Sequence, residues 1–154
     1  MIKKIGVNNY GEVLSKGMNM NLVSYKTYGD YQGDYIAVLQ KENIFFIYKG
    51  YFGSCSGCDW LERECDWADT KYKWGNNYAE FSYYLTEDQI KNYCSEEKPF
   101  LELTADQMEK IVNSKNPEQY FPANTRNSYD DFNFEDIKKQ LKDLIKNNDK
   151  KINK

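Results

Sequence analysis

Residues 21–52 carry the sequence feature that most restricts the fold. β-branched and aromatic side chains alternate there with short polar clusters, and the apolar positions do not recur at helical spacing. This pattern is typical of strands, which we expect at residues 22–28, 35–40 and 44–51, with a hairpin turn at residues 41–43. Shorter apolar runs before residue 21 predict one or two further short strands, on Ile2, Ile5, Val7, Val13 and Leu14.

The second half of the chain carries helix signals. Thr86 is followed three residues later by Gln89, and Thr104 by Gln107, so that each pair can form a capping box at the start of a helix. Asn133 precedes a third segment with apolar residues at helical spacing, which are Phe134, Ile137, Leu141, Leu144 and Ile145. The remaining patterns predict a short helix over residues 59–66, a second hairpin over 71–84, a short strand within 99–103 and a long loop over 116–133.

These patterns predict an α+β fold in which a mainly antiparallel sheet from the N-terminal half is packed by two or three C-terminal helices. The length fits a single domain over residues 1–154, and we expect the polar residues 147–154 to fray. No apolar run is long enough to cross a bilayer, and the N-terminal Met-Ile-Lys-Lys is not followed by a signal-peptide core. We therefore expect a cytoplasmic protein with no membrane partner.

The chain contains no histidine, and this absence restricts its chemistry more than any other fact of composition. It excludes Ser-His-Asp and Cys-His triads, histidine general bases and every metal site that uses histidine. Glycine-rich phosphate loops and nucleophile elbows are also missing. A pI near 5.1 with only two arginines, Arg63 and Arg126, argues against direct binding of nucleic acid. Composition therefore favours a protein that is not an enzyme.

The segment around Cys55 and Cys58 is the most distinctive motif, because it places a C-x-x-C between a predicted strand and a predicted helix. The preferred interpretation is structural, with reduced cysteines packed as small hydrophobes and no cofactor bound. Zinc binding by Cys55 and Cys58 is a second interpretation, although Cys65 and Cys94 do not form the second knuckle that such a site needs. Thiol redox chemistry is a third, with Cys55 activated at a helix N-terminus and Cys58 resolving the mixed disulfide.

The order of strand, C-x-x-C and helix, with Pro99 before a short strand downstream, is similar to thioredoxin-like proteins. The similarity covers little else. The first half lacks the βαβ unit of that fold, no Trp precedes Cys55, and five nearby acidic residues would oppose a thiolate.

Residues 31–35 (Tyr-Gln-Gly-Asp-Tyr) and 51–62 (Tyr-Phe-Gly-Ser-Cys-Ser-Gly-Cys-Asp-Trp-Leu-Glu) resemble small proteins encoded by phages and prophages of AT-rich bacteria. The resemblance covers only these two stretches. Such proteins have no agreed activity, so the resemblance implies a genetic setting and carries over no catalytic residue.

Tyrosines and acidic residues gather around the predicted turn at residues 29–34 and the predicted short helix. A tyrosine-rich patch beside carboxylates is typical of protein-binding surfaces. The candidate binding residues are Tyr28, Asp30, Tyr31, Asp34, Tyr35, Asp59, Trp60 and Glu62. The resulting hypothesis is a non-catalytic module that binds a host protein, in its most specific form a mobile-element inhibitor of a CRISPR-type defence nuclease. The alternative is a thiol oxidoreductase or a zinc-stabilised module centred on Cys55 and Cys58.

Overall fold

The computed structural model describes residues 3–29, 32–53, 59–75, 78–99, 101–120 and 134–152. Within these ranges seven strands, five α-helices and one 3-10 helix follow one another along the chain. They are β1 (Lys4–Val7), α1 (Tyr10–Met18), β2 (Asn21–Gly29), β3 (Gly33–Lys41), β4 (Ile44–Phe52), α2 (Trp60–Glu64), β5 (Lys71–Gly75), β6 (Tyr78–Thr86), α3 (Glu87–Ser95), β7 (Leu101–Thr104), α4 (Ala105–Asn113), η1 (Pro117–Tyr120) and α5 (Phe134–Ile152).

The strands form two antiparallel sheets. The larger has the order β2-β3-β4-β7, and the smaller has the order β1-β6-β5. β3 and β4 form a hairpin in which Lys41 pairs with Ile44, and Glu42 in the turn has a positive φ of 56°. The predicted α+β fold with a mainly antiparallel sheet is confirmed, including both hairpins and the short strand that becomes β7.

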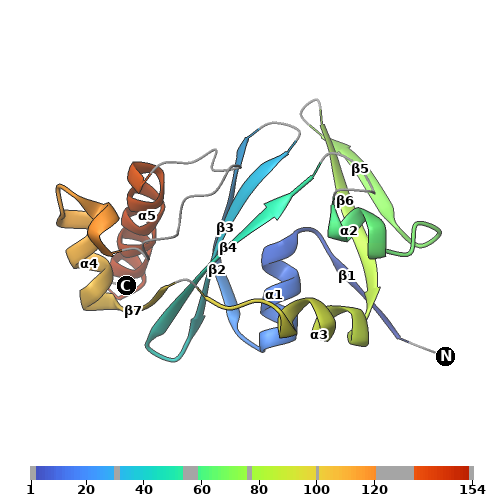
Figure 1. Ribbon diagram of the computed structural model, residues 1–154, viewed down its shortest axis with the longest axis horizontal. Helices are drawn as coiled ribbons and strands as arrows, with labels where there is room; N and C mark the ends of the chain where they lie inside the picture. The colour runs from blue at the N-terminus through green and yellow to red at the C-terminus, as the bar shows by residue number, and fades with distance from the viewer. Residues whose placement is uncertain are drawn as a thin grey trace.

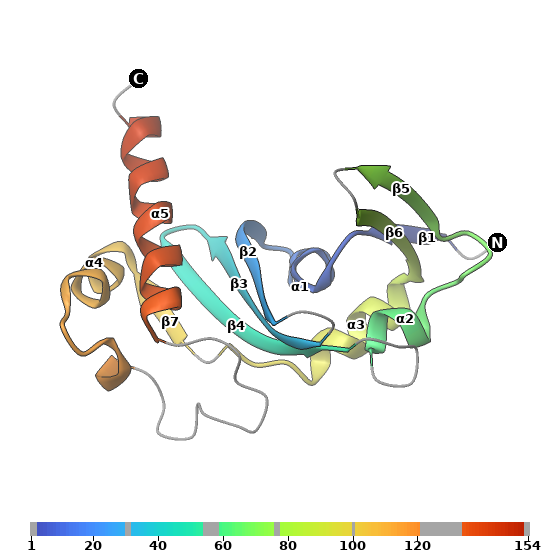
Figure 2. The ribbon, with the colours of Figure 1, turned by 90° about the horizontal axis from the view of Figure 1, so that it is seen from above.

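The elements are arranged in layers around the larger sheet (Figures 1 and 2). Helices α4 and α5 lie on one side of it, while α1, α3 and the smaller sheet lie on the other. β3 is one of the two interior strands, and its residues 33–39 are all buried because both faces of the sheet are covered. Alternate residues of β3 therefore belong to two different hydrophobic cores.

The α5-side core is mainly aliphatic. Its buried members are Tyr28, Ile36, Val38, Phe45, Ile47, Leu103, Met108, Ile111, Ile137, Leu141 and Leu144. Gln140 of α5 is buried among them, and its side-chain amide donates to Ser24 Oγ at 2.7 Å and to the Ile36 carbonyl at 3.2 Å. The Tyr28 hydroxyl donates to Gln140 Oε1 at 3.1 Å. The Gln140 side chain thus forms hydrogen bonds with three polar groups of β2 and β3 in this core.

The α1-side core contains more aromatic and polar groups. Its buried members are Val7, Tyr10, Val13, Leu14, Tyr35, Ala37, Leu39, Tyr48, Leu61, Cys65, Leu85, Ile90 and Cys94, with Tyr25, Trp60, Tyr83 and Tyr93 packed against them. Two glycines make this packing possible. A Cβ at Gly50 would lie 2.2 Å from the Tyr35 ring, and one at Gly17 would lie 2.2 Å from Cys94 Sγ, where α1 approaches α3.

Local capping chemistry explains where the helices begin. Thr86 and Thr104 form the two predicted capping boxes at α3 and α4. The prediction of a strand over Val13 and Leu14 is wrong, because these residues lie in α1. Asn9 caps α1 by accepting a hydrogen bond from the Glu12 N–H, which places Tyr10, Val13 and Leu14 on one buried face.

The last helix, α5, runs as far as Ile152, which is further than its apolar pattern indicated. Fraying of residues 147–154 stays a prediction. Among the described residues, no helix is both long and apolar enough to span a membrane.

Candidate functional site

The α1-side core contains a stacked group of aromatic rings. The Tyr10 and Tyr35 rings are parallel, with centroids 5.2 Å apart, and Tyr25 stacks on Tyr35 at 5.6 Å. Tyr93 of α3 lies 5.5 Å from Tyr10 and 4.6 Å from Trp60 of α2. These rings join α1, β2, β3, α2 and α3 into one packed unit.

Asp59 is the polar centre of this unit. It is buried, and its carboxylate accepts hydrogen bonds from the Gly53 N–H at 3.1 Å, from the Leu61 N–H at 3.0 Å and from the Tyr10 hydroxyl. The first residue after the cap is Trp60, so Asp59 also begins α2. Because its donors come from the end of β4, from α2 and from α1, Asp59 fixes α2 relative to both neighbours.

The buried tyrosine hydroxyls are held in the protonated state. Tyr35 and Tyr93 share a hydrogen bond of 2.6 Å, and burial raises the pKa of both hydroxyls far above the ordinary value. Burial also raises the pKa of Tyr10, and its hydrogen bond to Asp59 raises it further. A protonated, buried phenol is a poor nucleophile and a poor base, so these groups contribute packing and orientation.

The structure describes six of the eight predicted binding residues and places four of them in the interior. Tyr28, Asp34, Tyr35 and Asp59 are buried, so these four side chains do not form an exposed patch. The reason is that the covering helices lie on both faces of the sheet, which sequence periodicity alone does not reveal. Trp60 and Glu62 are half-buried, and Asp30 and Tyr31 lie outside the described residues.

The four cysteines divide into two pairs. Cys55 and Cys58 lie outside the described residues, so the zinc and redox interpretations stay predictions. Cys65 and Cys94 are buried free thiols, and burial raises the pKa of both, that of Cys94 to about 11. At neutral pH these two thiols are therefore protonated and weakly nucleophilic. The described part of the chain brings no three metal-ligating side chains together.

Trp67 is the functional candidate that sequence reasoning missed. Its side chain is 50 % exposed, which makes it the more exposed of the two large hydrophobic residues on the described surface; the other is Tyr120 at 39 %. The indole N–H donates to the Glu62 carbonyl at 2.8 Å, and the ring meets Tyr83 edge to face at 6.2 Å. We call Trp67 and the carboxylates close to it in the chain, Glu62, Glu64, Asp66 and Asp69, the Trp67 surface.

The turn that carries Trp67 is fixed by its own hydrogen bonds. The Asp66 carbonyl accepts from the N–H groups of Asp69 and Thr70, at 3.1 and 2.9 Å, and from the Thr70 hydroxyl at 2.8 Å. The Asp66 carboxylate accepts from the Ala68 N–H at 3.0 Å, and the Asp66 N–H donates to the Tyr84 carbonyl at 3.0 Å. Trp67 therefore lies in a turn that is closed on itself and anchored to β6.

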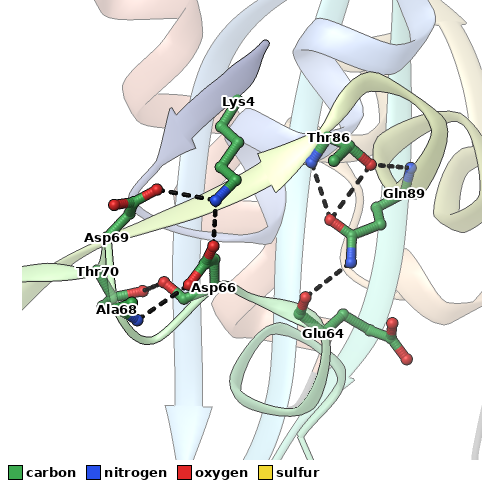
Figure 3. A network of polar contacts seen from close by, with 8 residues as sticks. All are labelled: Lys4, Glu64, Asp66, Ala68, Asp69, Thr70, Thr86 and Gln89. Carbon is green, nitrogen blue, oxygen red and sulfur yellow. Dashed lines mark hydrogen bonds and ion pairs between the residues drawn. The ribbon is translucent and has the colours of Figure 1, made fainter. Parts of the chain in front are cut away.

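Side chains from neighbouring elements hold the Trp67 surface on two sides (Figure 3). Lys4 of β1 donates to the carboxylates of both Asp66 and Asp69. These two hydrogen bonds raise the pKa of Lys4, and the hydrogen bond that Asp66 accepts from Lys4 lowers the pKa of Asp66. Gln89 of the α3 capping box donates to the Glu64 carbonyl at 2.8 Å, which ties α2 to α3.

One sequence signal could have identified Trp67. The predicted helix ends at Asp66, so Trp67 lies beyond its apolar stripe of Trp60, Leu61 and Cys65, between the carboxylates of Asp66 and Asp69 in the sequence. A tryptophan outside the apolar stripe and next to carboxylates is expected to face solvent.

Comparison with known proteins gives no match, because no protein-family model, curated protein or solved structure is significantly similar to this chain.

Proposed function

We propose that this protein is a non-catalytic binding module that contacts a partner protein through the Trp67 surface. The observation that carries the proposal is a half-exposed tryptophan in a turn whose backbone and indole N–H are both held by hydrogen bonds. Tryptophan is among the residues that contribute most to binding energy at protein interfaces.

Rigidity is what distinguishes Trp67 from an incidental exposed ring. A flexible side chain loses conformational entropy when a partner immobilises it, at a cost of about 0.5–1.5 kcal/mol. The Glu62 carbonyl and the Tyr83 ring already restrict the Trp67 indole, so much of its conformational entropy is lost on folding and not on binding. The arrangement thus supports tight contact at a small entropic penalty.

The buried chemistry of the molecule also supports recognition over catalysis. The tyrosines and the two described cysteines have raised pKa values and are enclosed in the α1-side core. These groups serve to orient α2 and the turn after it, so they support the surface without reacting. Inhibition of a host defence nuclease stays the most specific form of the proposal, and it rests on the resemblance to phage-encoded proteins.

A capture experiment tests the proposal. The tagged protein is incubated with an extract of its native host, and bound proteins are compared for the wild type, Trp67→Ala and Tyr120→Ala. Tyr120 is the matched control, because it is the other exposed large aromatic side chain of the described surface and lies in η1. We expect Trp67→Ala to lose the partner and Tyr120→Ala to retain it, with both variants folded by circular dichroism. A Trp67→Ala variant that captures the same partner as the wild type would refute the proposed surface.

A further inference from the structure

We infer that the partner of the Trp67 surface presents a basic segment, with an arginine or lysine side chain placed against the Trp67 indole and the carboxylates around it. The inference rests on the proposed function and specifies the chemistry of the partner. It follows from the charge, the hydrogen bonding and the exposure of the Trp67 surface.

The segment that contains the Trp67 surface is far more acidic than the rest of the chain. Residues 59–69 hold five carboxylates and one arginine, a net charge of −4, whereas the whole chain carries −3. Asp59 is buried and its carboxylate accepts hydrogen bonds within the core, so the other four carboxylates are the ones that belong to the Trp67 surface. A surface of this kind attracts cationic partners and speeds their association.

The protein itself shows that two of these carboxylates bind an ammonium group. Lys4 lies between Asp66 and Asp69, within 2.9 Å of the Asp69 carboxylate, so one cation serves two anions. Arg63 lies 3.4 Å from Glu64, and both side chains of this pair are exposed, so water screens their attraction. The Trp67 surface remains net negative after both internal pairs are counted.

Glu62 adds a carboxylate that the described residues do not fully satisfy. One of its oxygens, Oε2, is buried without a hydrogen-bond partner among them, although the residue as a whole is half-buried. Burial and the charge of Asp59 raise the pKa of Glu62. Because the Glu62 carbonyl accepts the indole N–H, this residue lies directly beside Trp67, and the positive charge of a partner bound nearby would favour the ionised form of its carboxyl group.

An aromatic face next to carboxylates is suited to a guanidinium or ammonium group. The cation gains from the electrons of the indole ring and from charge-assisted hydrogen bonds to the carboxylates. Nucleic acids and anionic membranes are negatively charged, like the Trp67 surface, and would be repelled by it. The Lys-rich α5 of a second copy is the competing occupant, and within one chain α5 lies on the far side of the larger sheet from α2.

The test uses the full chain labelled with nitrogen-15 and two peptide probes, hexa-arginine and the matched uncharged hexa-citrulline. The readout is the indole N–H signal of Trp67, identified by its loss in Trp67→Phe. We expect a saturable shift with hexa-arginine and none with hexa-citrulline. Raising the salt from about 20 to about 200 mM should weaken binding about tenfold.

Matched variants separate the local surface from the net charge of the protein. Glu62→Gln/Glu64→Gln removes two carboxylates next to Trp67, and Glu109→Gln/Glu135→Gln removes two exposed carboxylates from α4 and α5. We expect the first pair to weaken hexa-arginine binding at least about fivefold and the second less than about twofold. If Glu62→Gln/Glu64→Gln does not fold, Asp69→Asn, in the turn beyond α2, takes its place. We expect Asp69→Asn to weaken hexa-arginine binding at least about twofold.

Equal losses for the two pairs, equal binding of the two peptides, or no shift at Trp67 would overturn the inference. A Trp67 shift that depends on protein concentration without peptide would also overturn it, because the occupant would then be a second copy. None of these results bears on the capture of a host protein through Trp67. The proposed function fails only if Trp67→Ala leaves that capture unchanged.

Discussion

The two faces of the β2-β3-β4-β7 sheet bury their side chains by different means. On the α5 side, aliphatic residues fill the space and Gln140 satisfies the polar groups around it. On the α1 side, tyrosines stack on one another and their hydroxyls bond to Asp59 or to each other. The same strand, β3, contributes to both cores with alternate residues.

This difference indicates what each core is for. Apolar contacts tolerate small shifts, whereas hydrogen bonds between buried groups are directional and costly to break. The α1-side core therefore holds α2 in one orientation, and α2 in turn holds the Trp67 indole through the Glu62 carbonyl. The Trp67 surface lies on the side of the sheet where the polar core provides this rigidity.

Alkaline pH should produce the largest difference between the two cores in their contribution to the free energy of unfolding. Burial raises the pKa of Tyr10 and Tyr35 far above 10, so above pH 10 the unfolded chain loses these protons while the folded chain keeps them. Their contribution to stability is complete below pH 10 and falls above it, by up to about 1.4 kcal/mol per pH unit for each hydroxyl. Urea unfolding at steps of pH between about 9 and 11 measures this slope.

Phenylalanine variants identify the source of the alkaline loss. Tyr10→Phe and Tyr35→Phe should each reduce the slope, because each removes a buried hydroxyl whose pKa is raised in the fold. On the α5 side Tyr28, whose pKa burial raises to about 12, makes the corresponding contribution. A slope that neither Tyr10→Phe nor Tyr35→Phe alters would show that these hydroxyls ionise as freely in the fold as in the unfolded chain.

Truncation of Leu141 tests the α5-side core by volume. This side chain is fully buried between α5 and the sheet, so Leu141→Ala should lower the free energy of unfolding by about 2–5 kcal/mol. Leu141→Met keeps the volume and should cost less than about 1.5 kcal/mol. If urea unfolding gave the same loss of free energy for Leu141→Ala and Leu141→Met, the α5-side core would depend on exact shape and would not tolerate small shifts.

Asp59→Asn tests the α1-side core at constant size. The new amide group cannot accept from all three donors that Asp59 serves, and we expect a loss of about 1–3 kcal/mol in the free energy of unfolding. Asp143→Asn, on the exposed face of α5, is the control and should change stability by less than about 0.5 kcal/mol. If Asp59→Asn left the free energy of unfolding unchanged, the hydrogen bonds to Asp59 would not be what stabilises the α1-side core.

The elements that sequence predicts well are those with local causes. Strand alternation in residues 21–52, the capping boxes of Thr86 and Thr104 and the short helix within residues 59–66 each depend on a few neighbouring residues. The prediction lacked α1 although Asn9, its cap, is followed three residues later by Glu12, which is the spacing of a capping box. Its two glycines, Gly11 and Gly17, weaken the helical signal.

The candidate site was harder to predict because burial depends on distant partners. Tyr35 is buried since Gly50, across the hairpin, leaves space for its ring, and since its hydroxyl shares a hydrogen bond with that of Tyr93, far along the chain. Trp67 is placed by contacts with Glu62 and Tyr83, and its turn by β1 and β6. Composition does not show which of fourteen tyrosines faces inward.

The most direct test of the account is the mobility of the Trp67 indole in the free protein. Nitrogen-15 relaxation of its N–H group reports motion on the picosecond to nanosecond scale. If the α1-side core and the turn hold the ring ready for a partner, the order parameter should be near 0.85, as in a rigid backbone. A value below about 0.6 would show that Trp67 moves freely before binding and would contradict the central claim.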